Sequence, residues 1–263
     1  MPQRPKIIFA GNRLIAVQIL ELLISEGIKP LALLLPTQEK GSHNQEMKDL
    51  CGFLQSDQIL YGNEFRQADG IELLAKFNPD YIFCIHFPYI IPAQVLSIPK
   101  IGVLNLHPAF LPFNRGWHTP SWAILTESPI GGTLHFMDEN IDTGEIVHQK
   151  EVEVLPTDTA NSLYKRILET EYEVFKEALP TLIDGSYKRT SQKDLEGSIH
   201  SKEDLLAEDI RILDLDKEVK LGELLKILKA LTTNRVDESA FYEIDGKRYY
   251  LQVKITKDAK YEK

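Results

Sequence analysis

The sequence is poor in cysteine, with only Cys51 and Cys84 among its 263 residues. Two cysteines are too few for a disulfide framework or a metal cluster, and Cys84 lies in an apolar run that predicts a buried thiol. His135, His148 and His200 share no ligand spacing. We therefore predict no metal site, and these three histidines are given no role.

Long hydrophobic runs are also missing. No apolar stretch approaches the ~20 residues that a helix needs to cross a bilayer. The first apolar run, residues 6–10, resembles a buried strand rather than the hydrophobic region of a signal peptide. We expect no membrane partner and a cytoplasmic location.

Positive charge is in deficit. The 30 Lys and Arg residues face 39 Asp and Glu residues, which gives a formal net charge of -9. Broad nucleic-acid binding requires basic residues that neutralise phosphates, so we expect no nucleic-acid partner. The balance still allows one basic pocket for a phosphorylated small molecule.

Short apolar runs alternate with amphipathic helical patterns through the first two thirds of the chain. This alternation predicts an α/β fold in which helices cover both faces of a mostly parallel sheet. Helices are expected at 14–23, 45–54, 71–77 and 159–183. Strands are expected at 6–10, 31–35, 81–85, 101–106, 133–137 and 146–154, with the last two as candidates for antiparallel pairing.

The C-terminal part differs in kind. A helix is predicted at 221–231, followed by a β-hairpin of strands 240–244 and 247–255 that turns at Asp245-Gly246. The predicted organisation is a domain at 1–190, a polar linker at 191–208 and a small α+β appendage at 209–263. We expect the hairpin aromatics Phe241, Tyr249 and Tyr250 to serve packing rather than base stacking.

An amide, an imidazole and a carboxylate occur in an arrangement that suits catalysis. Asn105 and His107 alternate on one strand and so share a face near its carboxyl end, where α/β sheets place ligands. Asp142 follows in an acidic loop with Gly144. Acyl transfer to an external amine needs an oxyanion donor and a proton carrier but no protein nucleophile. From spacing alone, a structural role for these residues remains an alternative.

An ordered set of motifs surrounds these residues: Asn105-Leu106-His107-Pro108, Leu111-Pro112, Arg115-Gly116, Gly132-Thr133 and Asp142-Thr143-Gly144-Glu145-Ile146. The set resembles the formyl-tetrahydrofolate-dependent formyltransferases. The resemblance covers residues 6–183 and implies a Rossmann-like domain with Asn105, His107 and Asp142 as the catalytic set. It also implies formyl-tetrahydrofolate as co-substrate, bound by His86, Phe87, Tyr89, Ile90, Ile91, Met137, Asp138 and Asn140.

The string at residues 114–122 resembles the sugar N-formyltransferases that act on dTDP-linked amino-dideoxy sugars. The first turn, Gly11-Asn12-Arg13, lacks the glycine pattern of dinucleotide-binding folds, but a helix N-terminus there suits the diphosphate of an acceptor. The residues implied for acceptor binding are Asn12, Arg13, Arg115, Gly116, Trp117, His118 and Thr119. Trp122 has core packing as its alternative.

The implied function is N-formylation of the 3-amino or 4-amino group of a dTDP-linked sugar for a surface polysaccharide such as lipopolysaccharide O-antigen, by a homodimer. One alternative is a methionyl-tRNA formyltransferase-like enzyme, although the near-balanced charge of the appendage makes a poor tRNA platform. A second alternative is a folate- or nucleotide-binding module without catalysis.

Overall fold

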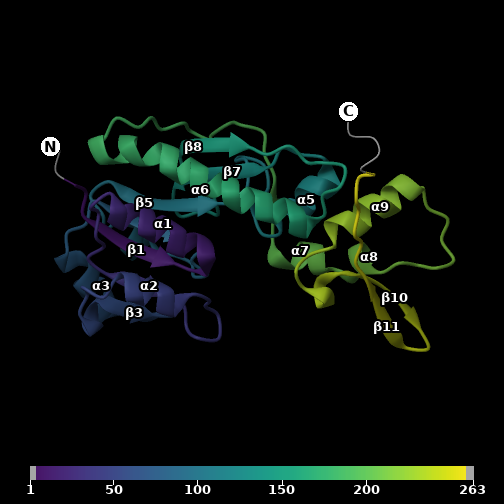
Figure 1. Cartoon of the computed structure of the whole chain (residues 1–263), viewed down its shortest axis with the longest axis horizontal. Coiled ribbons are helices and arrows are strands. Elements are labelled where there is room, and N and C mark those ends of the chain that lie inside the picture. Colours follow the sequence, from purple (N-terminus) through teal and green to yellow (C-terminus); the bar gives the residue numbers. More distant parts are fainter. Residues whose placement is uncertain (1–3, 259–263) are drawn as a thin grey trace. The chain divides into compact units, whose positions relative to one another are not determined.

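The structure, a computed structural model, describes residues 4–258 and divides into two compact units (Figure 1). Unit 1 contains the chain up to His107, Thr133–Lys150 and Glu171–Asp194, and unit 2 contains Pro108–Gly132, Glu151–Thr170 and the chain from Leu195 onward. The segments 108–132 and 151–170 therefore belong to the same unit as the C-terminal part of the chain.

Unit 1 is built on a seven-stranded sheet in the order β3-β2-β1-β4-β5-β7-β8. Pairing is parallel from β3 to β5, and β7 is antiparallel to β5. The predicted mostly parallel sheet and its antiparallel addition are confirmed. The strands are β1 (Ile7–Gly11), β2 (Leu33–Leu35), β3 (Ile59–Tyr61), β4 (Tyr81–Ile85), β5 (Gly102–His107), β7 (Gly131–Phe136) and β8 (Ile146–Glu151).

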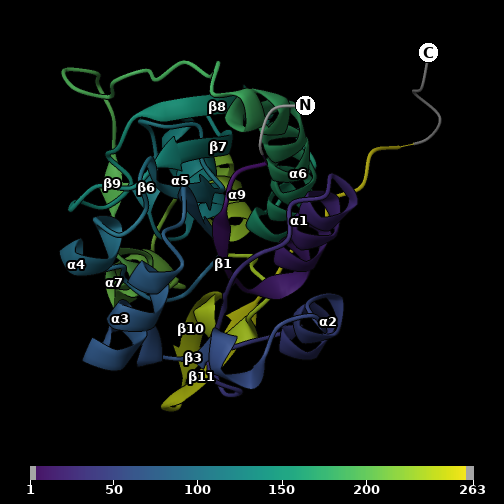
Figure 2. The same ribbon diagram turned by 90° about the vertical axis from the view of Figure 1, so that its left-hand side faces the viewer.

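The central strands are buried on both faces, as their continuous apolar runs require. Alternate residues of β1 and β4, such as Ile8 and Ile82, enter one hydrophobic cluster. The intervening residues face the other side, where Phe83 packs edge-on against Phe175. Figure 2 shows α1 and α2 on one side of the sheet and α3 and α4 on the other.

The predicted helices of unit 1 form with small shifts in their ends. They are α1 (Arg13–Ser25), α2 (Asn44–Leu50), α3 (Ala68–Lys76) and the long helix α6 (Ala160–Asp184), which contributes to both units. The short helix α4 (Ala93–Leu96) was not predicted. Helix α2 ends before the predicted residue 54, because the backbone turns at Cys51. Strand β3 was not predicted, since its three half-exposed residues carry no pattern of alternation.

Unit 2 holds the predicted hairpin. Strands β10 (Ala240–Ile244) and β11 (Lys247–Leu251) pair antiparallel, and Asp245 and Gly246 both have positive φ at the turn. Phe241 is fully buried, whereas Tyr249 and Tyr250 are exposed. The remaining elements are α5 (Thr119–Thr126), β6 (Arg115–Gly116), β9 (Ile199–His200), α7 (Lys202–Leu206), α8 (Glu208–Arg211) and α9 (Leu221–Ala230).

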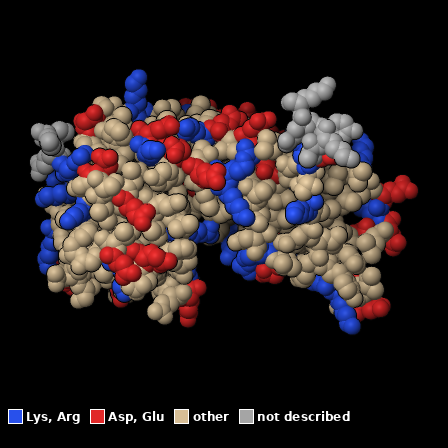
Figure 3. Space-filling view, in the orientation of Figure 1, with Lys and Arg blue, Asp and Glu red and all other residues tan. Residues whose placement is uncertain are grey.

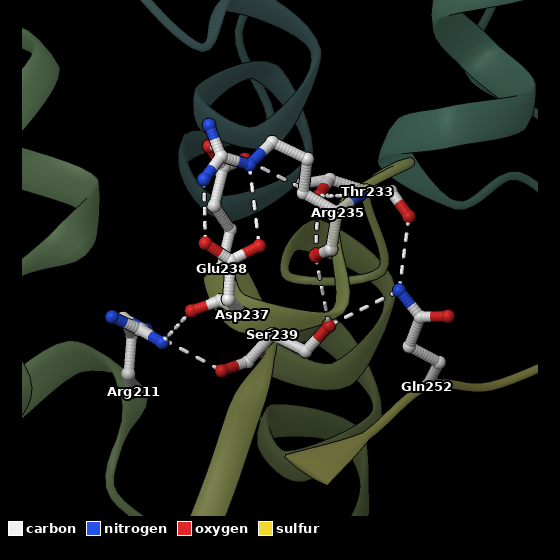
Figure 4. Close-up of polar contacts among 7 residues, drawn as sticks. All are labelled: Arg211, Thr233, Arg235, Asp237, Glu238, Ser239 and Gln252. Atoms are coloured by element: carbon white, nitrogen blue, oxygen red, sulfur yellow. Dashed lines mark hydrogen bonds and ion pairs between the residues drawn. The ribbon is translucent and has the colours of Figure 1, made fainter.

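A polar network joins the segments around the hairpin (Figure 4). The guanidinium of Arg211 donates to the backbone carbonyls of Asp237 and Ser239, and Arg235 pairs with the carboxylates of Asp237 and Glu238. Gln252 donates to the hydroxyl of Ser239. Arg211 thereby gives the backbone carbonyl of buried Ser239, directly before β10, a hydrogen-bond partner.

Within residues 4–258, no helix combines the length and the apolar character needed to cross a membrane. On the face drawn in Figure 3, acidic and basic side chains are interspersed.

Candidate active site

Asn105, His107 and Asp142 lie together at the carboxyl end of β5. Nε2 of His107 is 3.5 Å from Oδ2 of Asp142, and Nδ2 of Asn105 donates to Oδ1 of the same carboxylate at 3.4 Å. The side chains of His107 and Asp142 are 8% and 13% exposed, so the pair is shielded from bulk water. The loop from β7 to β8 thus brings the predicted carboxylate to the predicted imidazole and amide.

The backbone of the acidic loop is held from outside the loop. Nε2 of Gln192 donates to the carbonyl oxygens of Asp142 at 3.0 Å and of Gly144 at 2.6 Å. Asp142 has a φ of 54°, which is unfavourable for a residue with a side chain and persists only where the surroundings fix it. Gln192 therefore positions the Asp142 carboxylate, a role that the sequence did not indicate because the residue lies in a polar stretch without a motif.

His135, which the sequence analysis left without a role, belongs to the same cluster. It lies directly opposite Asn105 in the β5–β7 ladder, and its Nε2 is 3.2 Å from Nδ2 of Asn105 and 3.6 Å from Oδ1 of Asp142. The Nδ1 atom is 2.8 Å from the carbonyl oxygen of Phe136. A carbonyl only accepts, so Nδ1 carries the proton and Nε2 of the neutral ring accepts from Asn105. His135 thereby fixes which way the Asn105 amide faces.

We expect His135→Asn to lower kcat about 10-fold, the effect of losing one hydrogen bond of roughly 1.4 kcal/mol. The shorter amide keeps a donor near the Phe136 carbonyl but removes the acceptor for Asn105. Steady-state kinetics should show little change in the KM of either substrate. His135→Gln, which places an amide near the position of Nε2, should restore most of the turnover. Equal losses in both variants would assign His135 a purely structural role.

The cluster contains no side chain that is suited to act as a nucleophile. Cys84 is the β4 partner of Asn105, but it is 2% exposed and burial raises the pKa of its thiol to about 12. Thr133 lies opposite His107 and is fully buried, with its hydroxyl donating to Gln149. A thiol that stays protonated and a buried hydroxyl are poor nucleophiles. The arrangement suits a reaction in which a substrate supplies the nucleophile.

The loop after β4 and the segment after β7 meet in one apolar cluster. Phe87, Tyr89 and Met137 pack against buried Ile91 and its neighbours, while Ile90 is 80% exposed. Phe87 and Tyr89 have ring centroids 5.2 Å apart. The predicted folate-binding residues Phe87, Tyr89, Ile91 and Met137 thus belong to one hydrophobic cluster.

The polar members of the predicted folate set are partly engaged within the protein. Nε2 of His86 lies 2.9 and 3.0 Å from the two carboxylate oxygens of Glu171, which is fully buried. Oδ1 of Asp138 accepts from the backbone N–H of Asn140 and from the hydroxyl of Thr143. The imidazole of His86 thus anchors its loop to α6, and Asp138 stiffens the acidic loop.

Asn12 and Arg13 occupy the turn between β1 and α1. Oδ1 of Asn12 caps α1 by accepting from the Arg13 N–H at 2.9 Å, and it also accepts from the Ser42 N–H at 2.9 Å. Arg13 is exposed and has a φ of 69°, a strained value of the kind that gathers at ligand sites. Asn12 therefore joins two loops, while Arg13 is presented to solvent at the N-terminus of α1.

The predicted acceptor-binding string from Arg115 to Thr119 lies in unit 2. Trp117 is 50% exposed, with Nζ of Lys202 5.6 Å from its ring centroid. Burial lowers the pKa of His118, and the hydroxyl of Thr119 donates to the Pro108 carbonyl. The structure thus separates the predicted acceptor residues between the two units, with Asn12 and Arg13 in unit 1.

The second tryptophan of the string has a packing role. Trp122 stacks on His200 with ring centroids 4.0 Å apart, and it packs against the hydrophobic cluster of unit 2. Gly116, at a φ of 89°, passes so close to the His200 carbonyl that a Cβ would lie 2.3 Å from its oxygen. Trp122 is therefore a partly buried packing residue beside the core of its unit.

Sequence models of two known families match the chain. The Formyl transferase model matches residues 5–179, and the model of the N-formyltransferase dimerization C-terminal domain matches residues 207–257. The residues matched by the Formyl transferase model include the whole cluster at the end of β5, which defines the class of this protein as formyl-transferring. The chain belongs to the formyl transferase family and is an enzyme.

Individual relatives and solved structures agree with this assignment. The dTDP-4-amino-4,6-dideoxyglucose formyltransferase of Mycobacterium tuberculosis is 30% identical over 174 residues, which are 66% of this chain and 72% of that protein. The methionyl-tRNA formyltransferase of Clostridium tetani is 32% identical over 198 residues, 73% of this chain and 63% of that protein. A 4-N formyltransferase structure from Francisella tularensis superimposes with a TM-score of 0.81 at 23% identity, covering 97% of this chain and 99% of the other.

Proposed function

We propose that this enzyme transfers the formyl group of formyl-tetrahydrofolate to the amine of a dTDP-linked amino-dideoxy sugar. The cluster of Asn105, His107 and Asp142 carries the proposal, because it offers an amide, an imidazole and a carboxylate and no nucleophile. The proposed setting is the cytoplasm, and the product serves a surface polysaccharide such as lipopolysaccharide O-antigen.

The proposed reaction uses the amine of the acceptor as nucleophile. Its nitrogen attacks the formyl carbon and forms a tetrahedral intermediate whose oxygen becomes negative. A donor near that oxygen lowers the barrier. The amide nitrogen of Asn105 has two contacts, at 3.2 Å to His135 and at 3.4 Å to Asp142. The longer one, to Asp142, is the weaker, and the N–H that makes it can donate to the oxyanion instead.

His107 moves the proton. As the amine attacks, it loses a proton to the imidazole, and the folate nitrogen receives a proton as the C–N bond to the formyl group breaks. The carboxylate of Asp142 beside Nε2 of His107 stabilises the imidazolium between these steps. Gln192 and His135 keep the carboxylate and the amide in place.

The proposed folate site is the cluster of Phe87, Tyr89, Ile91 and Met137. Aromatic and aliphatic side chains suit a flat heterocycle, and the backbone of loop 86–92 and of Asp138 to Asn140 supplies polar groups for its edge. The buried contact of His86 with Glu171 holds one end of this loop. Truncating one partner of such a buried pair leaves the other unpaired, which is strongly unfavourable.

The dTDP-sugar is supported by two observations. The relative from M. tuberculosis is named for such a substrate. Trp117 offers an exposed aromatic face, with Lys202 beside it and Arg115, Gly116, His118 and Thr119 in the same string. We also propose a homodimer formed through the C-terminal hairpin, where Tyr249 and Tyr250 are exposed and where the dimerization-domain model matches.

Arg13→Ala should raise the KM for the nucleotide sugar roughly 10- to 150-fold and leave kcat within about 3-fold of the native value. The guanidinium, at a helix N-terminus, is proposed to contact the diphosphate, and such a charged hydrogen bond contributes ~1.5–3 kcal/mol to binding. Initial rates at varied acceptor concentration give the measurement. An unchanged KM would remove Arg13 from the acceptor site. Arg66, on the same unit but outside the turn, is the control position.

The deciding experiment is a formyl-transfer assay with formyl-tetrahydrofolate. The acceptors are dTDP-linked 3-amino and 4-amino dideoxy sugars, a GDP-linked amino sugar and charged initiator tRNA, and products are identified by mass spectrometry. Gain of one formyl group by a dTDP-sugar is expected and identifies the amine. Formylation of tRNA alone would overturn the acceptor, and no transfer to any of them would favour a non-catalytic binding module.

A further inference from the structure

A fully buried carboxylate contacts the first residue of the proposed folate loop. The oxygens of Glu171, on α6, lie 3.0 and 2.9 Å from Nε2 of His86, and the two side chains are 0% and 6% exposed. A buried carboxylate is unfavourable unless it is hydrogen-bonded, so Glu171 depends on this contact. We propose that Glu171 is a positioning residue for the folate, which acts by holding His86 in the backbone conformation that forms the folate site. The inference rests on the proposed function.

His86 interrupts the alternation of side chains along β4. Cys84 faces the hydrophobic cluster that contains the proposed folate site, and Phe83 faces α6. Continued alternation would direct residue 86 to the cluster and residue 87 to α6. The structure shows the reverse, because His86 contacts Glu171 of α6 and Phe87 packs against the cluster.

The exchange of faces coincides with a strained backbone angle. The φ of His86 is 53°, in the left-handed region that residues with a Cβ avoid. Such a conformation persists only where the surroundings fix it. Glu171 is a suitable anchor, because it lies one helical turn before Phe175, the α6 residue that packs against Phe83 of β4. The carboxylate is therefore fixed relative to the strand from which the loop departs.

The conformation of His86 decides which side chains the loop presents to the folate. Phe87 and Tyr89 pack edge-on against Phe65, with ring centroids 5.5 and 6.3 Å apart. A return of His86 to an extended conformation would turn Phe87 away from this group. The imidazole of His86 is itself directed to α6 and shielded. His86 therefore serves the folate through the loop backbone and not through contact of its ring with the folate.

Two rival roles for the pair make different predictions. If Glu171 only stabilises the fold, its loss lowers the amount of folded enzyme and leaves the KM of both substrates unchanged. If the His86 ring binds the folate directly, its removal weakens folate binding equally whatever residue takes its place. A positioning role predicts a selective loss of folate affinity that depends on the backbone preference of residue 86.

The first test measures the KM of each substrate. Glu171→Ala should raise the KM for formyl-tetrahydrofolate roughly 5- to 30-fold, the factor that corresponds to an unsupported left-handed residue. The KM for the amino sugar should not change, and kcat at saturating folate should stay within about 3-fold of the native value. Calorimetry with tetrahydrofolate should show the same loss of affinity. Glu171→Gln, whose amide oxygen accepts from the His86 ring, should restore near-native values.

An exposed pair on the same helix provides the matched control. Glu177 of α6 contacts His148 at 2.9 Å, as Glu171 contacts His86, but its side chain is 45% exposed and the pair lies outside the folate loop. Glu177→Ala should leave the KM of both substrates unchanged.

The second test replaces His86 by glycine or by alanine in the Glu171→Gln protein, where the group left without a partner is neutral. Both replacements remove the imidazole, but only glycine adopts a positive φ without strain. The glycine variant should therefore bind tetrahydrofolate roughly 5- to 30-fold more tightly than the alanine variant. Equal affinities would overturn the proposal, and this comparison remains decisive even if Glu171→Ala fails to fold.

The outcomes separate this inference from the proposed function. If the native enzyme formylates a nucleotide sugar but folded Glu171→Ala keeps the native KM for formyl-tetrahydrofolate, the positioning role is wrong and the function stands. If the native enzyme does not bind tetrahydrofolate, the proposed function fails and the inference fails with it.

Discussion

Replacing His107 by asparagine should lower kcat by about two to four orders of magnitude, the range expected for loss of an acid–base group. An asparagine amide fills part of the space of the imidazole but does not extend to the position of Nε2, and it neither takes a proton from the amine nor gives one to the folate nitrogen. The position is at the carboxyl end of β5 and the side chain is 8% exposed, so the sheet should form normally. Circular dichroism and the thermal midpoint should match the native enzyme.

The pH dependence distinguishes proton transfer from simple positioning. In the native enzyme, a histidine that cycles between its neutral and charged forms gives the pH–rate profile a limb that belongs to that residue. His107→Asn should lose that limb and show a low, flat rate. His148→Asn is the matched control, because His148 lies on β8, pairs with Glu177 at 2.9 Å and is exposed. Near-native turnover of His107→Asn would remove His107 from the mechanism.

The sequence was sufficient to predict the architecture and to identify the site side chains that lie close together along one strand. Continuous apolar runs predicted the buried parallel strands, and strand alternation placed Asn105 and His107 on one face. The position of Asp142 followed from a motif, since no local rule fixes where a loop returns. The short strand β3 was missed because its three residues carry too little pattern.

The interactions that hold the cluster could not be predicted from the sequence, because they depend on the register between strands and on contacts between residues far apart in the chain. His135 could be placed on a strand, but only the β5–β7 register sets it opposite Asn105. Gln192 lies 50 residues from Asp142 and has no neighbouring motif. Position along the chain does not fix the division into units, since the string from Arg115 to Thr119 lies between two catalytic motifs and belongs to unit 2.

Gly144→Ala should lower kcat by about 100-fold or more while the protein remains folded. A Cβ at this position would lie 1.9 Å from the carbonyl oxygen of Phe136 and 2.8 Å from its carbonyl carbon, far inside van der Waals contact. Both obstacles are backbone atoms at the end of β7, so the acidic loop must move. Asp142, two residues earlier, moves with it, and a displacement of about 1 Å in a catalytic group is enough for a loss of this size.

The substitution should also lower the free energy of unfolding by ~1–3 kcal/mol, the usual effect of overpacking. Kinetics well below the thermal midpoint separate the two effects, because the remaining protein is then folded and only the geometry of the site differs. Gly52→Ala is the control: its Cβ would meet only the Asp49 carbonyl oxygen, at 3.5 Å, and both activity and stability should stay near native. Full turnover in Gly144→Ala would show that Asp142 tolerates displacement, and the carboxylate would then not be the group that stabilises the His107 imidazolium.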